Sequence, residues 1–171
     1  MTFASSGSGG SQHLTAEIFQ LATGTKMTHI PYKGGGPAMI DLMSGQVNLL
    51  FASVLEGSGY IKTGKLKALA ASHVKRNPAL PDVPTLAEAG VLDAESGSWI
   101  TLLAPSGTPG NVVAEIEADL KDTVSAPEVR EKLIAQGAVP QASTPKELQA
   151  LIDADLRRYG RIIKEQRLKA D

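Results

Sequence analysis

A run of seven small, hydrogen-bonding residues near the start of the chain could hold an anion. Glycine permits φ > 0 and lets a ligand approach the main chain closely, and the helical pattern that follows would add unpaired N–H groups and the positive end of a helix dipole. Such a loop is a cradle for a carboxylate or a phosphate. The alternative is an ordinary solvated turn with Ser11 as a helix N-cap. The candidate contacts are Ser5, Ser6, Gly7, Ser8, Gly9, Gly10 and Ser11, followed by His13, which could donate a hydrogen bond to the anion or face solvent.

A second glycine-rich stretch, residues 30–37, also separates an expected strand from an expected helix. Tyr32 offers an apolar ring and a hydroxyl suited to the wall of a small-molecule pocket, and Lys33 and the amide of Gly34 could face the same anion. In open α/β sheets ligands bind at the carboxyl ends of the strands, so two such loops at neighbouring strands indicate a binding edge. A turn with a solvated lysine is the alternative.

Sequence patterns typical of enzymes are absent. No serine lies in a G-x-S-x-G context, and Gln12 stands where G-x-G-x-x-G would need its third glycine. The P-loop lysine pattern does not occur, and the histidines lie far apart without a carboxylate at ligand spacing. We therefore expect a binding protein without catalytic residues, metal or cofactor.

The composition excludes other classes of function. A length of 171 residues suits one domain or parts of two, and 42% hydrophobic and 20% charged residues are ordinary for a globular protein. The net charge of −1 gives no basic surface of the kind that binds nucleic acid. No apolar run reaches the length of a membrane span, and the lack of cysteine excludes disulfides and a thiol nucleophile. Residues 1–4 run almost directly into the serine and glycine loop without a leader, so we expect a truncated start.

Strands and helices are expected to alternate along the first half of the chain. Glycines at positions 24, 45 and 64 are typical of helix ends. The alternation predicts an α/β fold with a mostly parallel or mixed sheet flanked by helices. The expected strands are residues 1–4, 27–30, 47–51 and 66–71, and the expected helices are 14–21, 37–43 and 54–63.

The second half is expected to be mainly helical. After the proline-rich residues 74–84 we expect a short helix over 85–90 and a strand over 99–104. Apolar residues at helical spacing between Val112 and Val124 predict a helix that buries one stripe. Helix starts are expected at Thr108-Pro109 and at three capping-box patterns, Thr85-x-x-Glu88, Ser125-x-x-Glu128 and Thr144-x-x-Glu147.

Several of these stretches, taken in order, resemble the receptors of tripartite tricarboxylate transporters, the TctC or Bug family of solute-binding proteins. The resemblance covers essentially the whole chain, and the run from Pro78 to Gly90 is especially specific. The other matching stretches are residues 3–14, 29–38, 45–51 and 64–70, Trp99, and residues 103–109.

The resemblance implies a type II periplasmic-binding-protein-like fold whose two lobes close over a carboxylate. It implies a periplasmic location and, as partners, the carboxylate ligand and the membrane subunits of the transporter. Residues 1–95 would form the second, ligand-binding lobe without its first elements. Residues 96–171 would return to the first lobe and carry long terminal helices, so that the chain lacks part of the first lobe.

The same resemblance assigns the carboxylate to the amides and hydroxyls of residues 5–11. Ala52 departs from the family, in which many members carry an Asp that lines the pocket. Because Ala52 cannot pair with an ammonium group, we expect an intact relative of this chain to prefer simple di- or tricarboxylates to amino acids.

Half of such a site is expected to bind weakly. Three or four charge-assisted hydrogen bonds of about 1.5–3 kcal/mol each are opposed by an association cost of about 4–15 kcal/mol, whereas micromolar affinity needs about 8 kcal/mol net. We therefore expect millimolar binding at best, and an uncovered sheet edge that favours homo-oligomers. The alternative function is a truncated remnant that acts as an oligomeric interaction or sensor module without high-affinity binding.

Overall fold

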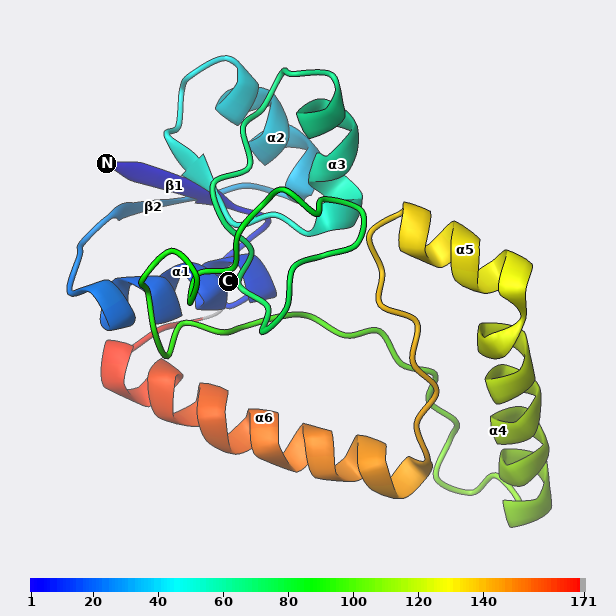
Figure 1. Ribbon diagram of the computed structural model, residues 1–171. Coiled ribbons are helices and arrows are strands. Elements are labelled where there is room, and N and C mark those ends of the chain that lie inside the picture. Colours follow the sequence, from blue (N-terminus) through cyan, green and yellow to red (C-terminus); the bar gives the residue numbers. More distant parts are fainter. Residues whose placement is uncertain (170–171) are drawn as a thin grey trace.

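The computed structural model describes residues 1–169 and places a small parallel sheet toward one end of the molecule (Figure 1). Within the described residues this sheet has three strands in the order β2-β1-β3, namely β1 (Thr2–Ser5), β2 (Thr28–Pro31) and β3 (Leu49–Leu50). Both pairings are parallel, with Ser5 opposite Pro31 and Ala4 opposite Leu50. We expected a mostly parallel or a mixed sheet, and the described sheet is parallel. The loops that follow β1 and β2 therefore leave the same edge of the sheet.

Different helices cover the two faces of the sheet. Helix α1 (Ser11–Thr23) lies on one side, and α2 (Gly35–Met43) and α3 (Val54–Lys62) lie on the other (Figure 1). Phe3 and Ala4 are fully buried, and as neighbours on a strand they point to opposite faces. Ala4 packs with Ala38 and Val47, whereas the ring of Phe3 meets Phe51 edge-on. The central strand β1 is thus held on both sides.

The helix ends in this half follow the local sequence signals. Gly24 caps α1 in the left-handed conformation with φ 65°, as its place after the helical pattern predicts. Helix α3 ends at Lys62, shortly before Gly64 at φ 72°. Helix α2 begins at Gly35, two residues earlier than expected, and ends at Met43.

The expected strands over residues 66–71 and 99–104 are wrong. Residues 66–71 contribute a single parallel bridge, between Ala71 and Thr85, and residues 99–104 form no regular element. A strand needs a hydrogen-bonded neighbour, and no described strand lies beside either segment. The expected helix over 85–90 is also wrong. The Thr85–Glu88 hydrogen bonds are present, but they close a turn.

The three later helices are α4 (Gly110–Ser125), α5 (Pro127–Ala135) and α6 (Pro145–Gln166). The capping box of Thr144 and Glu147 is confirmed, but Ser125 is the last residue of α4 and Ala126 is the N-cap of α5. Pro109, not Thr108, is the N-cap of α4. The end of the expected segment 96–171, residues 170 and 171, lies outside the described residues.

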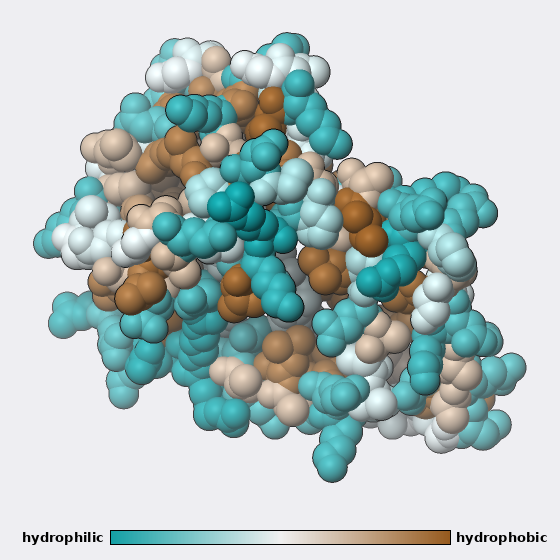
Figure 2. Space-filling view, viewed as in Figure 1, coloured by the Kyte–Doolittle hydropathy of each residue, from teal (hydrophilic) through white to brown (hydrophobic). Residues whose placement is uncertain are grey.

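Helix α6 returns to the part of the molecule that contains the sheet. Its Ile162 packs in a buried cluster with Ile18 of α1, Leu86 and Ala94, while α4 and α5 stand to one side (Figure 1). The expected burial of an α4 stripe is wrong for this chain, because Val112, Ile116 and Leu120 are 36–39% exposed. Figure 2 shows hydrophobic residues around the hollow between the sheet-containing part, α5 and α6.

No helix within residues 1–169 is both long enough and apolar enough to cross a membrane.

Candidate functional site: the serine and glycine loop

The loop between β1 and α1, residues 5–11, leaves the carboxyl end of the central strand and runs into the first turn of the helix. Gly7 and Gly9 have φ of 141° and 78°, in the region that favours glycine. The helix N-cap is Gly10, so the alternative of a Ser11 cap is wrong, and no side chain caps this end. The first-turn amides of α1, including those of Ser11 and Gln12, therefore lack helical acceptors next to the positive end of the helix dipole.

Three of the loop amides are already hydrogen-bonded within the chain. The N–H of Ser6 donates to Gln12 Oε1 at 2.8 Å, that of Gly7 to Ser5 Oγ at 3.2 Å and that of Gly9 to His13 Nδ1 at 3.0 Å. These amides hold the loop in shape. Next to these contacts lie the first-turn amides of α1 and the side chains of half-buried Ser6 and Ser8 and exposed Ser11.

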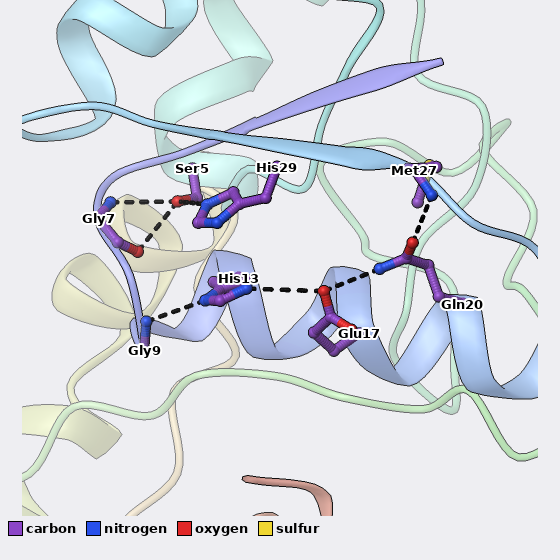
Figure 3. Close-up of polar contacts among 8 residues, drawn as sticks. All are labelled: Ser5, Gly7, Gly9, His13, Glu17, Gln20, Met27 and His29. Atoms are coloured by element: carbon purple, nitrogen blue, oxygen red, sulfur yellow. Dashed lines mark hydrogen bonds and ion pairs between the residues drawn. The ribbon is translucent and has the colours of Figure 1, made fainter. Parts of the chain in front are cut away.

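Ser5 faces the interior of the protein. Its side chain is fully buried, its hydroxyl donates to the carbonyl of Gly7 at 3.0 Å, and the same oxygen lies 2.6 Å from His29 Nε2 (Figure 3). Ser5 thus links β2 to the loop.

His13 is also buried, at 5% exposed. Its Nδ1 accepts the N–H of Gly9, and its Nε2 lies 3.6 Å from Glu17 Oε1 (Figure 3). The ring stacks on that of His29, with centroids 3.9 Å apart and planes 16° apart. Because Nδ1 acts as an acceptor, His13 in this arrangement braces the loop from inside.

The second glycine-rich stretch lies directly against the first. The N–H of Tyr32 donates to the carbonyl of Ser5 at 2.9 Å, and the N–H of Gly34 donates to that of Ser6 at 3.2 Å. The Tyr32 hydroxyl donates to Asp41 Oδ2 at 2.7 Å, and this hydrogen bond raises the pKa of the phenol above its ordinary value. Lys33 is exposed. The expected proximity of the two loops is confirmed, while the Tyr32 hydroxyl is directed to α2.

Ala52 is exposed just before Ser53, the N-cap of α3. It is joined to the loop through Glu56, whose Oε2 accepts from Ser53 Oγ at 2.9 Å and from Gln12 Nε2 at 3.0 Å. Residues 5–11 and 32–34 are therefore connected by hydrogen bonds, and Ala52 adjoins Ser53, which is connected to Gln12 through Glu56.

The sequence analysis missed three residues of this network, Gln12, His29 and Glu56. The sequence pattern at Gln12 gives no sign of this contact, which arises because the first turn of α1 keeps its side chain near the loop. Glu56 had a local signal, because Ser53-x-x-Glu56 is a capping-box pattern. His29 had none, because its contact with Ser5 depends on strand pairing. Within residues 1–169, no group of three His, Cys, Asp or Glu side chains is placed to hold a metal ion.

Several known proteins are similar to this chain. The profile of the "Tripartite tricarboxylate transporter family receptor" matches residues 1–168. The chain is 33% identical to protein BugT of Bordetella pertussis, over 96% of this chain and 51% of BugT. It is 32% identical to the "UPF0065 protein in clcB-clcD intergenic region" of Pseudomonas knackmussii, over 96% of this chain and 98% of that protein. The chain spans about half the length of several curated relatives that it matches.

Solved structures of similar proteins have the same fold as this chain. "R. palustris Rpa4515 with adipate" superposes with a TM-score of 0.89 at 32% identity, over 98% of this chain and 56% of that one. "MatC (Rpa3494) from Rhodopseudomonas palustris with bound malate" superposes with a TM-score of 0.83 at 29% identity, over 95% of this chain and 56% of that one. The expected fold class is thereby confirmed.

Proposed function

We propose, since this chain belongs to the tripartite tricarboxylate transporter receptor family, that it binds a small organic carboxylate at the serine and glycine loop. The observation that carries the proposal is the start of α1, where a loop braced from inside leads into a helix end without a side-chain cap. Membership of a receptor family also agrees with the expectation that this chain binds a ligand without catalysing a reaction.

The proposed contacts divide the loop into two groups. The first-turn amides of α1 and the hydroxyls of Ser6, Ser8 and Ser11 would face the carboxylate, because hydrogen bonds to charged groups are shorter and stronger than those between neutral groups. Ser5 and His13, with the amides of Gly7 and Gly9, would maintain the shape of the loop.

The second loop and Ala52 would line the approach to this site. Exposed Lys33 adds a positive charge, and Gly34 keeps its loop against Ser6. Ala52 adds no charge, which favours simple carboxylates over amino acids. Adipate and malate, the ligands named for the two solved relatives, are both dicarboxylates and are suitable probes.

The affinity of this chain is expected to be low. The first-turn amides and serine hydroxyls supply three or four contacts, and at about 1.5–3 kcal/mol each these only balance an association cost of about 4–15 kcal/mol. We therefore propose binding in the millimolar range at best. Family membership further supports a periplasmic location and the transporter's membrane subunits as partners.

A titration followed by backbone amide NMR tests this proposal. Adding malate or adipate to the full chain should shift the amide signals of residues 8–12 at millimolar ligand, whereas 1,6-hexanediol, a neutral match for adipate, should not. Absence of a shift at about tens of millimolar, a range in which binding is worth only about 2–3 kcal/mol, would contradict the proposal.

An oligomeric interaction module remains the second candidate. The segment over residues 99–103 carries Trp99, Ile100, Leu102 and Leu103 at exposures of 42–98%. Contiguous apolar surface of this kind marks interaction sites in soluble proteins.

A further inference from the structure

Gln12 occupies a junction between the serine and glycine loop and the other helices. It lies in the first turn of α1 and is only 7% exposed. Its Oε1 accepts the N–H of Ser6 at 2.8 Å, and its Nε2 donates to Glu56 Oε2 at 3.0 Å. One buried side chain thus connects the loop after β1 with the start of α3.

We propose that Gln12 is the positioning residue of the carboxylate loop. It would act through Ser6, fixing the main chain from which the ligand-binding groups project, without itself touching the ligand. The effect of Gln12 on ligand affinity rests on the proposed function. Its effect on the shape of the loop depends only on the hydrogen bonds described above.

The peptide groups at Ser6 explain why this position matters. The N–H of Ser6 is held by Gln12, and its carbonyl accepts the N–H of Gly34 from the second loop. Ser6 is thus fixed at both its N–H and its carbonyl, by elements on different parts of the chain. Loss of the Gln12 contact would release the N–H side and leave the Gly34 side in place.

Glu56 is the other end of the connection and is itself closely held. Its Oε2 accepts the N–H of Ser53 at 3.1 Å and the hydroxyl of Ser53 at 2.9 Å, as the capping box of α3. At Gly35, the first residue of α2, an added Cβ would lie 2.3 Å from Glu56 Oε1. Gln12 therefore reaches a carboxylate packed between the starts of α2 and α3.

The amide of glutamine suits this place chemically. It supplies an acceptor for the N–H of Ser6 and a donor for the Glu56 carboxylate, and it adds no charge beneath a site proposed for anions. A glutamate at position 12 would keep the acceptor, but it would oppose Glu56 and place a negative charge near the ligand. An apolar residue would leave the N–H of Ser6 without this acceptor and would remove one of the donors to Glu56.

A reciprocal exchange of the two side chains tests the proposal. The readouts are the hydrogen-exchange rate of the Ser6 amide and the Kd for malate and adipate. Gln12→Ala should speed exchange of Ser6 about tenfold, corresponding to the loss of one hydrogen bond of about 1.4 kcal/mol, and should weaken both ligands. Gln12→Glu should also release Ser6, because two carboxylates then meet.

The double variant Q12E/E56Q separates position from charge. It restores an amide–carboxylate pair of reversed polarity, so the Ser6 exchange rate should return to that of the unmodified chain. The affinity for malate and adipate should stay low, because the negative charge now lies next to the loop. If Gln12→Ala does not fold, this double variant and Gln12→Met provide the same comparison.

Gln20 provides a matched control on the same helix. It also joins a main-chain N–H, that of Met27 at 2.5 Å, to a carboxylate, Glu17 Oε1 at 2.8 Å (Figure 3). Gln20→Ala should cost similar stability and leave Ser6 exchange and ligand affinity unchanged. Unchanged Ser6 exchange in Gln12→Ala, or an equal response in Gln20→Ala, would overturn the proposal. If the unmodified chain binds neither ligand, the proposed function fails, while Ser6 exchange still decides the role of Gln12.

Discussion

His13 and His29 stack face to face beneath the serine and glycine loop, with ring centroids 3.9 Å apart. His29 in turn stacks on Phe3 at 4.8 Å, in the centre of the sheet. The two rings bond different parts of the loop, His29 through Ser5 Oγ and His13 through the N–H of Gly9 (Figure 3). A ring stack anchored on β1 and β2 thus supports both ends of the loop.

Replacing His13 tests this support. His13→Phe keeps a stacked ring but removes the acceptor of the Gly9 N–H, and an unpaired donor costs about 1–3 kcal/mol. We expect the free energy of unfolding in urea to fall by about 1 kcal/mol and exchange of the Gly9 amide to accelerate. His29→Phe, which keeps the stack and loses the Ser5 contact, is the matched variant and should leave Gly9 exchange slow. Slow exchange of Gly9 in His13→Phe would contradict the prediction.

A side chain at Gly35 should displace the Glu56 carboxylate. An added Cβ would lie 2.3 Å from Glu56 Oε1 and 3.3 Å from Glu56 Cδ, and this carboxylate is held by Gln12 and Ser53. Because Glu56 is exposed and its side chain can shift, Gly35→Ala should lower stability by only about 1 kcal/mol, the cost of one lost hydrogen bond between Gln12 and Glu56. Gly59→Ala, in α3 with nothing within 4 Å of the added Cβ, should instead raise stability by about 0.4–1 kcal/mol. Urea unfolding of both variants checks the sign, and stabilisation by Gly35→Ala would show that Glu56 moves freely.

The start of α6 should weaken in acid. The backbone N–H of Thr144, aided by its hydroxyl, donates to Glu147 and holds the pKa of this carboxyl below its usual value. A carboxyl with a lowered folded-state pKa stabilises the fold above its unfolded pKa of about 4.3 and loses that contribution as the pH falls through the folded value.

The carboxyl ¹³C signal of Glu147 should therefore titrate at lower pH in the chain than in a peptide of residues 145–150. Thr144→Ala should move its midpoint toward that of the peptide. Equal midpoints in the unmodified chain and the peptide would disprove the capping effect.

At the proposed site, the residue at position 52 should determine the preference between ligands with and without an ammonium group. Ala52→Asp would place a carboxylate near the loop, so succinate should bind more weakly relative to aspartate, whose ammonium could pair with the new group. Ala52→Asn adds similar volume without charge and should leave the ratio of the two Kd values unchanged. A preference for aspartate in the unmodified chain would contradict the expectation drawn from Ala52.

The exposed apolar segment should promote self-association. Ile100 is 98% exposed and Leu103 is 73% exposed, and burying each between two copies would remove apolar area from water at about 25 cal/mol per Å². Light scattering after size exclusion should show a mass that rises with protein concentration. The variant Ile100→Asp with Leu103→Asp should remain monomeric, whereas Leu55→Asp, at a separate site 60% exposed, should not change association. A monomer at all concentrations would remove this candidate function.

Local signals in the sequence were sufficient where the structure depends on near neighbours. The Gly24 cap, the Thr144–Glu147 box and the alternation of the first strands and helices follow from residues a few positions apart. The two glycine-rich loops could be placed at one sheet edge because the alternation of strands and helices predicts parallel strands, whose carboxyl ends share an edge. The expected strands over 66–71 and 99–104 failed because a strand exists only beside a partner, which composition cannot supply.

The sequence by itself therefore determined that a serine and glycine loop joins a buried strand to a helix start. The tertiary structure alone decided which of its groups face inward. The amides of Ser6 and Gly9 found acceptors on Gln12 and His13, and Ser5 met His29 only because β1 pairs with β2. Hydrogen-bonding groups that leave water must pair in the folded chain, and which partner each one reaches depends on how the strands and helices pack.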